Sequence, residues 1–191
     1  MKQLGLSTIV AIALTLPAFA DPPQLKGDYA FTYNDFCLQS TSGFNPNGTP
    51  LAGPVEGTST AGTGFEHFNG DGTGTVKIIS NVEVTLASIP LGSSITTPVG
   101  GSFQFTYAFN PDGSFTMTTV PGTFIAPGSY SINPGFVWRG FISNDGKTHT
   151  LTSIPPLIQT ITVNTPPPSP PITVFQACRS NVVGIALNPA D

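Results

Sequence analysis

Alternating polar and apolar residues constrain the fold of this chain more than any other feature. Residues 28–33 read "DYAFTY" and residues 103–109 read "FQFTYAF", so that every second side chain is aromatic. Successive side chains of a β-strand point to opposite faces of a sheet, whereas a helix repeats about every 3.6 residues. The alternation therefore predicts half-buried strands, and almost no segment shows helical spacing.

Similar segments along the chain predict about 8 to 10 strands in total. The run at 75–88 alternates apolar with polar residues over a length that is typical of a long or bent strand. The other predicted strands cover 61–68, 114–120, 135–143, 148–154, 157–163 and 172–178. The segment after Cys178 is expected to add either a short helix or a final strand.

Three short connectors rich in Asn, Asp and Gly separate predicted strands, at residues 69–72, 110–113 and 144–146. These residue types tolerate the positive φ of tight turns, so each connector predicts a hairpin. The first lies in "FNGDGTG", which also suggests a calcium loop. Calcium needs several oxygen ligands, usually with more than one carboxylate, but Asp71 is the only carboxylate between Glu66 and Glu83. We therefore expect a turn here and no metal site.

Consecutive hairpins build either an up-and-down barrel or a two-sheet sandwich. Cys37 and Cys178 are the only cysteines, and an even count in an exported chain predicts an intramolecular disulfide. That bond would bring the first predicted strand, which precedes Cys37, beside the predicted strand at 172–178. When the first strand of a meander pairs with the last, the sheet closes into a barrel and has no exposed edges. We therefore predict an all-β antiparallel barrel, with the sandwich as the alternative.

Residues 1–20 have the pattern of a secretory signal peptide. Lys2 precedes an apolar run at 4–16, and the small residues Ala18 and Ala20 predict cleavage after Ala20. We expect residues 21–191 to form one domain in the periplasm or outside the cell, with no membrane span after cleavage. The sequence does not indicate an oligomeric state.

Charge and loop composition narrow the choice of partners. Only 8% of residues are charged and the net charge is −4, which excludes nucleic acid because its binding depends on many Lys and Arg side chains. The Pro- and Gly-rich segments 42–59, 88–101 and 164–171 lack alternation and are predicted to be surface loops. A surface adhesin that uses the first two loops for contacts is therefore one functional hypothesis.

Catalytic candidates are few because the chain contains only two His residues. Glu66, His67 and His149 are weak candidates for acid and base chemistry, if a barrel mouth brings them together with Glu83 and Arg139. They would suit a small-molecule isomerase or hydrolase. No zinc-binding pattern or serine-nucleophile motif is present, and no cofactor is implied. Arg139 points away from Trp138 and either reaches solvent, which we favour, or pairs with a carboxylate.

The aromatic faces are the strongest functional signal. These aromatic side chains could fill the core of the barrel completely. Alternatively they could line a cavity, because a barrel of this size can hold one small apolar ligand. Our leading hypothesis is a non-enzymatic exported protein that binds such a ligand or serves as an envelope structural module. The candidate ligand-binding residues are Tyr29, Phe31, Tyr33, Phe105, Tyr107 and Trp138.

A resemblance to known proteins rests on a small number of motifs. The G-x-Y-x-F opening at 27–31, the following Cys37 and the later "FNGDGTG" before a long β run resemble exported bacterial proteins that are expected to form calycin-like or allene-oxide-cyclase-like barrels. The resemblance implies a barrel fold and an exported location. It implies no activity.

Overall fold

The computed structural model describes residues 25–85, 94–95, 100–125, 130–133, 135–154, 157–163, 170 and 172–187. The predicted signal peptide at 1–20 lies outside these residues, as does most of the Pro-rich segment 164–171. The described elements are all β-strands. They are β1 (Gly27–Ser40), β2 (Glu56–Phe68), β3 (Thr73–Thr85), β4 (Ser94–Ile95), β5 (Gly101–Phe109), β6 (Phe115–Thr119), β7 (Tyr130–Asn133), β8 (Val137–Ile142), β9 (Thr148–Ser153), β10 (Leu157–Val163) and β11 (Ile172–Ala186).

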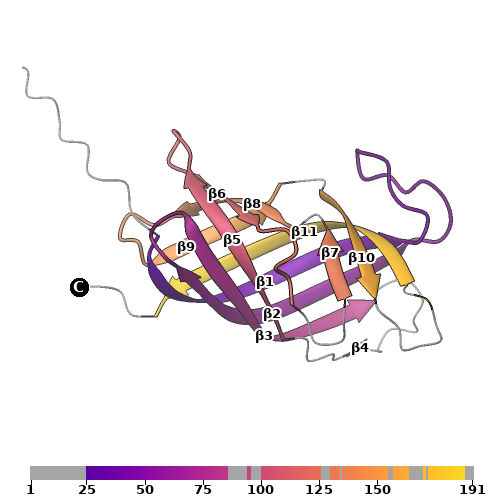
Figure 1. Cartoon of the computed structure of the whole chain (residues 1–191), viewed down its shortest axis with the longest axis horizontal. Helices are drawn as coiled ribbons and strands as arrows, with labels where there is room; N and C mark the ends of the chain where they lie inside the picture. The colour runs from indigo at the N-terminus through magenta and orange to yellow at the C-terminus, as the bar shows by residue number, and fades with distance from the viewer. Residues whose placement is uncertain are drawn as a thin grey trace, which may run out of the picture.

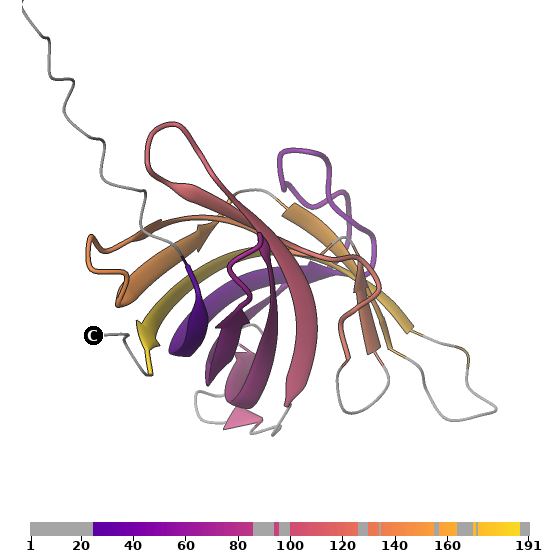
Figure 2. The same ribbon diagram turned by 60° about the vertical axis from the view of Figure 1, so that its left-hand side comes forward.

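Eight of the strands close into an antiparallel barrel. Their order around the ring is β1, β2, β3, β5, β6, β8, β9 and β11, and β11 pairs back onto β1 over nearly its full length. Figures 1 and 2 show these strands curving around a common axis. The predicted barrel is confirmed, and the two-sheet alternative is discarded.

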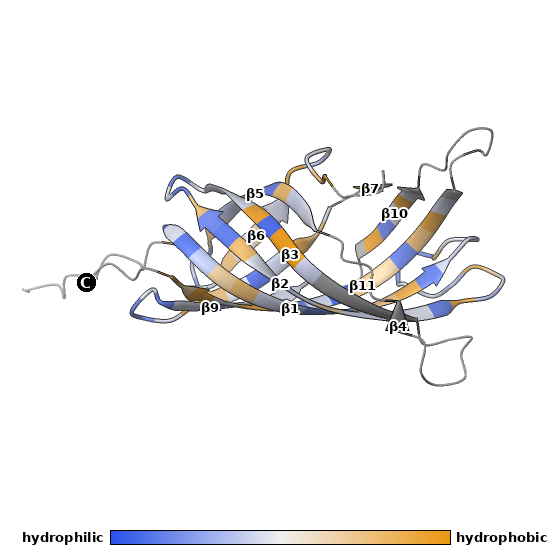
Figure 3. Ribbon diagram, turned by 90° about the horizontal axis from the view of Figure 1, so that it is seen from below, coloured by the Kyte–Doolittle hydropathy of each residue, from blue (hydrophilic) through white to orange (hydrophobic). Residues whose placement is uncertain are grey.

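The long strands of the barrel extend beyond the closed ring at one end. There β11 leaves β9 and pairs with β10, β10 pairs with β7, and the end of β3 pairs with β4. Figure 3 shows β7 and β10 set apart from β5 and β6 at this end, which we call the far end. The opposite end, which we call the turn end, carries the hairpins β2–β3, β5–β6 and β8–β9.

All three predicted hairpins are confirmed, and they share one turn chemistry. Oδ1 of Asp71 accepts hydrogen bonds from the backbone N and the hydroxyl of Thr73, at 3.0 and 2.6 Å. These bonds stabilise the ionised form and lower the pKa of Asp71 below its usual range. Gly70 and Gly72 have φ values of 84° and 90°, which side chains with a Cβ rarely adopt. Asp112 accepts the same two bonds from Ser114, whereas Asp145 accepts one from the backbone N of Lys147 and one from the hydroxyl of Ser143.

Several strands differ in length from the sequence prediction. β1 runs on to Ser40 and β11 to Ala186, so Cys37 and Cys178 lie inside strands and the segment after Cys178 is strand rather than helix. β2 begins at Glu56, inside the predicted loop 42–59, and β4 lies inside the predicted loop 88–101. The sequence did not predict the second half of β1 as strand, because its inward residues Asp35, Cys37 and Gln39 are not the large apolar residues that mark the first half.

Aromatic side chains close the turn end of the barrel. The ring of Phe68 packs edge-on against Tyr29, Phe105 and Tyr107, with ring centroids 5.0–5.3 Å apart. The Tyr107 hydroxyl donates to the carbonyl of Leu25, which lies fully buried over this cluster. This half of the barrel is a packed core rather than a hollow.

Candidate functional site

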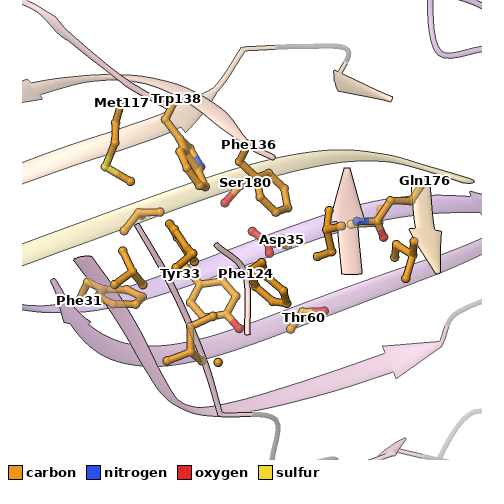
Figure 4. Close-up of a pocket in the computed structure, with 18 of the residues that line it drawn as sticks. Phe31, Tyr33, Asp35, Thr60, Met117, Phe124, Phe136, Trp138, Gln176 and Ser180 are labelled. Carbon is orange, nitrogen blue, oxygen red and sulfur yellow. The ribbon is translucent and has the colours of Figure 1, made fainter. Parts of the chain in front are cut away.

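A cavity of about 350 Å³ occupies the barrel between the packed turn end and the far end. Figure 4 shows its walls. Its apolar lining is Phe31, Tyr33, Val76, Ile78, Phe103, Met117, Phe124, Ile132, Phe136, Trp138, Ile161 and Val182. Its polar and acidic lining is Asp35, Gln39, Thr58, Thr60, Glu66, Gln176 and Ser180.

Four roughly parallel aromatic rings form one wall of the cavity. Trp138 stacks with Phe136 at 5.1 Å and 22° and with Phe103 at 6.1 Å and 13°. Phe124 continues the series from Phe103 at 6.2 Å and 26°. Such offset parallel arrangements are favourable between aromatic rings. A flat apolar molecule beside them would continue the same stacking.

The opposite wall comes from β1, whose inward side chains change character along the strand. Phe31 and Tyr33 lie nearer the turn end, Asp35 follows, and Cys37 and Gln39 lie nearer the far end. This order arises because every second residue of a strand faces the same side of a sheet. β1 therefore places a carboxylate midway along an otherwise largely apolar cavity (Figure 4).

Asp35 is partly buried and lines the cavity. Its neighbours across the strand pairs are Ser180 on β11 and Thr60 on β2. Burial raises the pKa of Asp35 to about 6, and a hydrogen bond with the Ser180 side chain opposes part of this rise. The second oxygen, Oδ1, is buried without a hydrogen-bond partner among the described residues.

Glu66 and His149 meet at the inner limit of the cavity. Oε2 of Glu66 lies 2.8 Å from Nε2 of His149, and their side chains are 2% and 0% exposed. The contact does not have the geometry of a hydrogen bond. Tyr29 and Phe68 pack edge-on against the imidazole at 5.1 and 5.5 Å. Glu66 lines the cavity, whereas His149 lies behind it in the packed turn end.

The other catalytic candidates lie outside the barrel. Nδ1 of His67 lies 2.6 Å from Oδ1 of Asp28, and both side chains are more than half exposed. Arg139 pairs with Asp112 on the outer surface while remaining half exposed. The structure therefore brings Glu66 to His149 but separates both from His67 and Arg139. In the described parts of the chain, no cluster of three or more His, Cys, Asp or Glu could hold a metal ion.

The predicted ligand-binding residues divide into two groups. Phe31, Tyr33 and Trp138 line the cavity. Tyr29, Phe105 and Tyr107 belong to the packed turn end and do not reach it. Sequence periodicity indicates which face a side chain occupies but not its height along the barrel, so it could not separate these groups.

The predicted disulfide between Cys37 and Cys178 is confirmed. The two residues are directly opposed on β1 and β11, with Cα atoms 4.1 Å apart, and both side chains are buried. The bond joins the first and last strands of the ring and faces the cavity. It closes the barrel covalently beside Asp35.

Asp35 was not among the predicted site residues, although the sequence contains a signal for it. Tyr29, Phe31 and Tyr33 define the inward face of β1, and two further steps of the same alternation reach Asp35 and Cys37. The inward disulfide cysteine supports the same assignment. A carboxylate between an inward Tyr and an inward Cys is therefore predicted to face the interior.

No protein-family model matches this chain, and neither a curated protein nor a solved structure shows significant similarity to it. Within the described residues, the structure contains no helix that is long and apolar enough to span a membrane.

Proposed function

We propose that this protein binds one small, mostly apolar molecule inside its barrel. The observation that supports this proposal is the cavity of about 350 Å³, which lies within the size range of small-molecule sites. An eight-stranded barrel has an interior wide enough to be filled by side chains or to hold one small ligand. Here the turn end is filled and the remainder is hollow.

The chemistry of the walls supports the same function. Ligand sites place a few polar groups within largely apolar surroundings, and those groups orient the ligand. Three residues that line this cavity each have a buried polar atom without a hydrogen-bond partner among the described residues: Oδ1 of Asp35, Oε2 of Glu66 and Nε1 of Trp138. Because leaving such atoms unpaired costs free energy, a bound molecule that satisfies one of them gains affinity.

Binding is better supported than catalysis. The imidazole of His149 is enclosed by rings and His67 lies on the outer surface, so neither histidine faces the cavity. Glu66 reaches the cavity, but its Oε2 atom lies against Nε2 of His149. We therefore assign the Glu66–His149 pair to the stability of the turn end.

An exported location is part of the proposal. The Cys37–Cys178 disulfide fits an oxidising compartment, and residues 1–20 have the sequence of a signal peptide. The protein would then bind its ligand in the periplasm or outside the cell.

The test uses N-phenylnaphthylamine, a probe that is neutral at neutral pH and brightens in apolar surroundings. Trp138 is the only tryptophan and lines the cavity, so its emission can be transferred to a probe bound there. We expect saturable binding at one site with loss of Trp138 emission. Binding that does not saturate, or that leaves Trp138 emission unchanged, would contradict a ligand site in the barrel.

A further inference from the structure

We propose that the natural ligand carries a protonated amine that pairs with Asp35 inside the barrel, so that the cavity selects cations over neutral and anionic molecules. This inference rests on the proposed function, because it specifies the ligand class of the same cavity. It concerns the polar end of the ligand, whereas the proposed function concerns its apolar body.

The charges around the cavity favour a cation. Asp35 and Glu66 are the acidic residues of its lining, and no Lys, Arg or His belongs to that lining in the described parts of the chain. His149 is the nearest base to Glu66, and it meets that carboxylate from within the packed turn end. A ligand carboxylate would face a like charge without a counterion, whereas an amine would face an opposite charge.

Asp35 is the carboxylate available to such a ligand. Across β1 and its neighbours it faces the hydroxyl residues Ser180 and Thr60, neither of which can neutralise it. The Ser180 side chain hydrogen-bonds to the carboxyl, yet Oδ1 is left without a described partner. A carboxylate oxygen that is buried without a hydrogen-bond partner is costly, and a donor that also carries positive charge stabilises it.

Aromatic rings around the same cavity add to the attraction for a cation. Tyr33 is the next inward residue of β1, and Phe124, Phe136 and Trp138 line the cavity with it (Figure 4). The faces of aromatic rings attract cations, and the attraction is stronger where water is excluded. A molecule with a flat apolar body and one amine therefore matches both the ring wall and the carboxylate.

Three ligands on one scaffold test the inference: naphthylmethylamine, naphthylmethanol and naphthoate, all substituted at the same ring position. Each is titrated against the wild-type protein near neutral pH, by displacement of N-phenylnaphthylamine. We expect the amine to displace the probe at a concentration about tenfold or more below that of the alcohol, with naphthoate weakest. The wild-type comparison needs no variant.

Two variants then identify the carboxylate. Asp35→Asn keeps the shape and removes the charge, and the ratio of amine to alcohol affinity is expected to fall to about one. Asp28→Asn is the matched control, because Asp28 lies on the same strand but is exposed on the outer surface. This control should keep the wild-type ratio.

The outcomes separate the two proposals. Equal displacement by the amine and the alcohol in the wild type would overturn the cation inference and leave ligand binding intact. A preference for the amine that survives Asp35→Asn would also overturn it, because Asp35 would not be the partner. Failure of N-phenylnaphthylamine itself to bind would remove the proposed function and this inference together.

Discussion

Nε2 of His149 lies 2.8 Å from Oε2 of Glu66 inside the barrel, where neither side chain is more than 2% exposed. Two polar groups that are buried against each other are each costly to bury when the partner is removed. The pair joins β2 to β9, which are not neighbours in the ring. It therefore connects strands across the interior of the turn end.

Removing one residue of this pair should lower the stability of the protein more than its share of the loss when both residues are replaced by apolar ones. We expect Glu66→Leu and His149→Phe to lower the free energy of unfolding by about 3 kcal/mol each, because each leaves one buried group uncompensated. The free energy of unfolding of the double variant should fall by clearly less than the sum of the two single losses. Urea unfolding of all four proteins measures the coupling, and single effects that add within about 0.5 kcal/mol would show that the two residues act independently.

Gly184 makes room for the same imidazole. It pairs with Phe31 on β1 and His149 on β9, and a Cβ at this position would overlap the His149 ring. Gly184→Ala should therefore destabilise the protein by about 1–3 kcal/mol in thermal or urea unfolding. Gly100→Ala is the control, because its added Cβ would lie 3.4 Å from the carbonyl oxygen of Ile78, which is an ordinary contact. Equal effects of the two substitutions would exclude a steric role for His149.

The disulfide should contribute strongly to stability because it closes a long loop. Cys37 and Cys178 are 141 residues apart, and the chain-entropy model gives on the order of 4 to 5 kcal/mol for such a loop. We expect the Cys37→Ala, Cys178→Ala double variant to unfold at a markedly lower urea concentration. An unchanged midpoint with an unchanged urea dependence would show that strand pairing alone determines closure of the barrel.

The burial of Asp35 should reduce stability as the pH rises. Its pKa is raised from 3.8 to about 6 in the folded protein, so between these values the folded state binds a proton that the unfolded state has released. The contribution of Asp35 to the free energy of unfolding is therefore fully present below pH 3.8 and is lost as the pH rises to about 6. The whole change corresponds to about 3 kcal/mol.

Asp35→Asn isolates this effect from the other carboxylates. The turn residues Asp71, Asp112 and Asp145 have lowered pKa values and the opposite pH dependence, but they are present in both proteins. As the pH rises from about 3.5 to about 7.5, the free energy of unfolding of the wild type should fall by about 3 kcal/mol relative to that of the variant. A constant difference in unfolding free energy would mean that Asp35 is solvated like an ordinary surface carboxylate.

The sequence was sufficient to predict the barrel because its local signals agree. The alternation at 28–33 and 103–109, the Asp-Gly turns and the cysteine pair each favour the same closed meander. Strand ends were less predictable, since β1 continues through Asp35 and Gln39, whose polarity resembles that of a loop. Polar side chains can extend a strand where its inward face meets a cavity rather than a packed core.

The hollow itself could not be predicted from sequence. It depends on which inward residues lie at the same height on strands that are far apart in the chain. Phe68 packs against both Phe105 and His149 and helps to fill the turn end, whereas Asp35 lies beside the small residues Ser180 and Thr60 and lines the cavity. This arrangement is set by strand register, which periodicity alone does not specify.

The central claim is that a small apolar molecule occupies the barrel, and a pair of adjacent substitutions tests it most directly. Thr60 lines the cavity and Ser59 is exposed on the outer face of the same strand. Affinity for N-phenylnaphthylamine is measured for Thr60→Phe and Ser59→Phe by transfer from Trp138. We predict that Thr60→Phe weakens binding about tenfold or more because its ring occupies the cavity, while Ser59→Phe binds like the wild type. Equal affinity in the two variants would contradict the claim, because the probe would then be bound elsewhere.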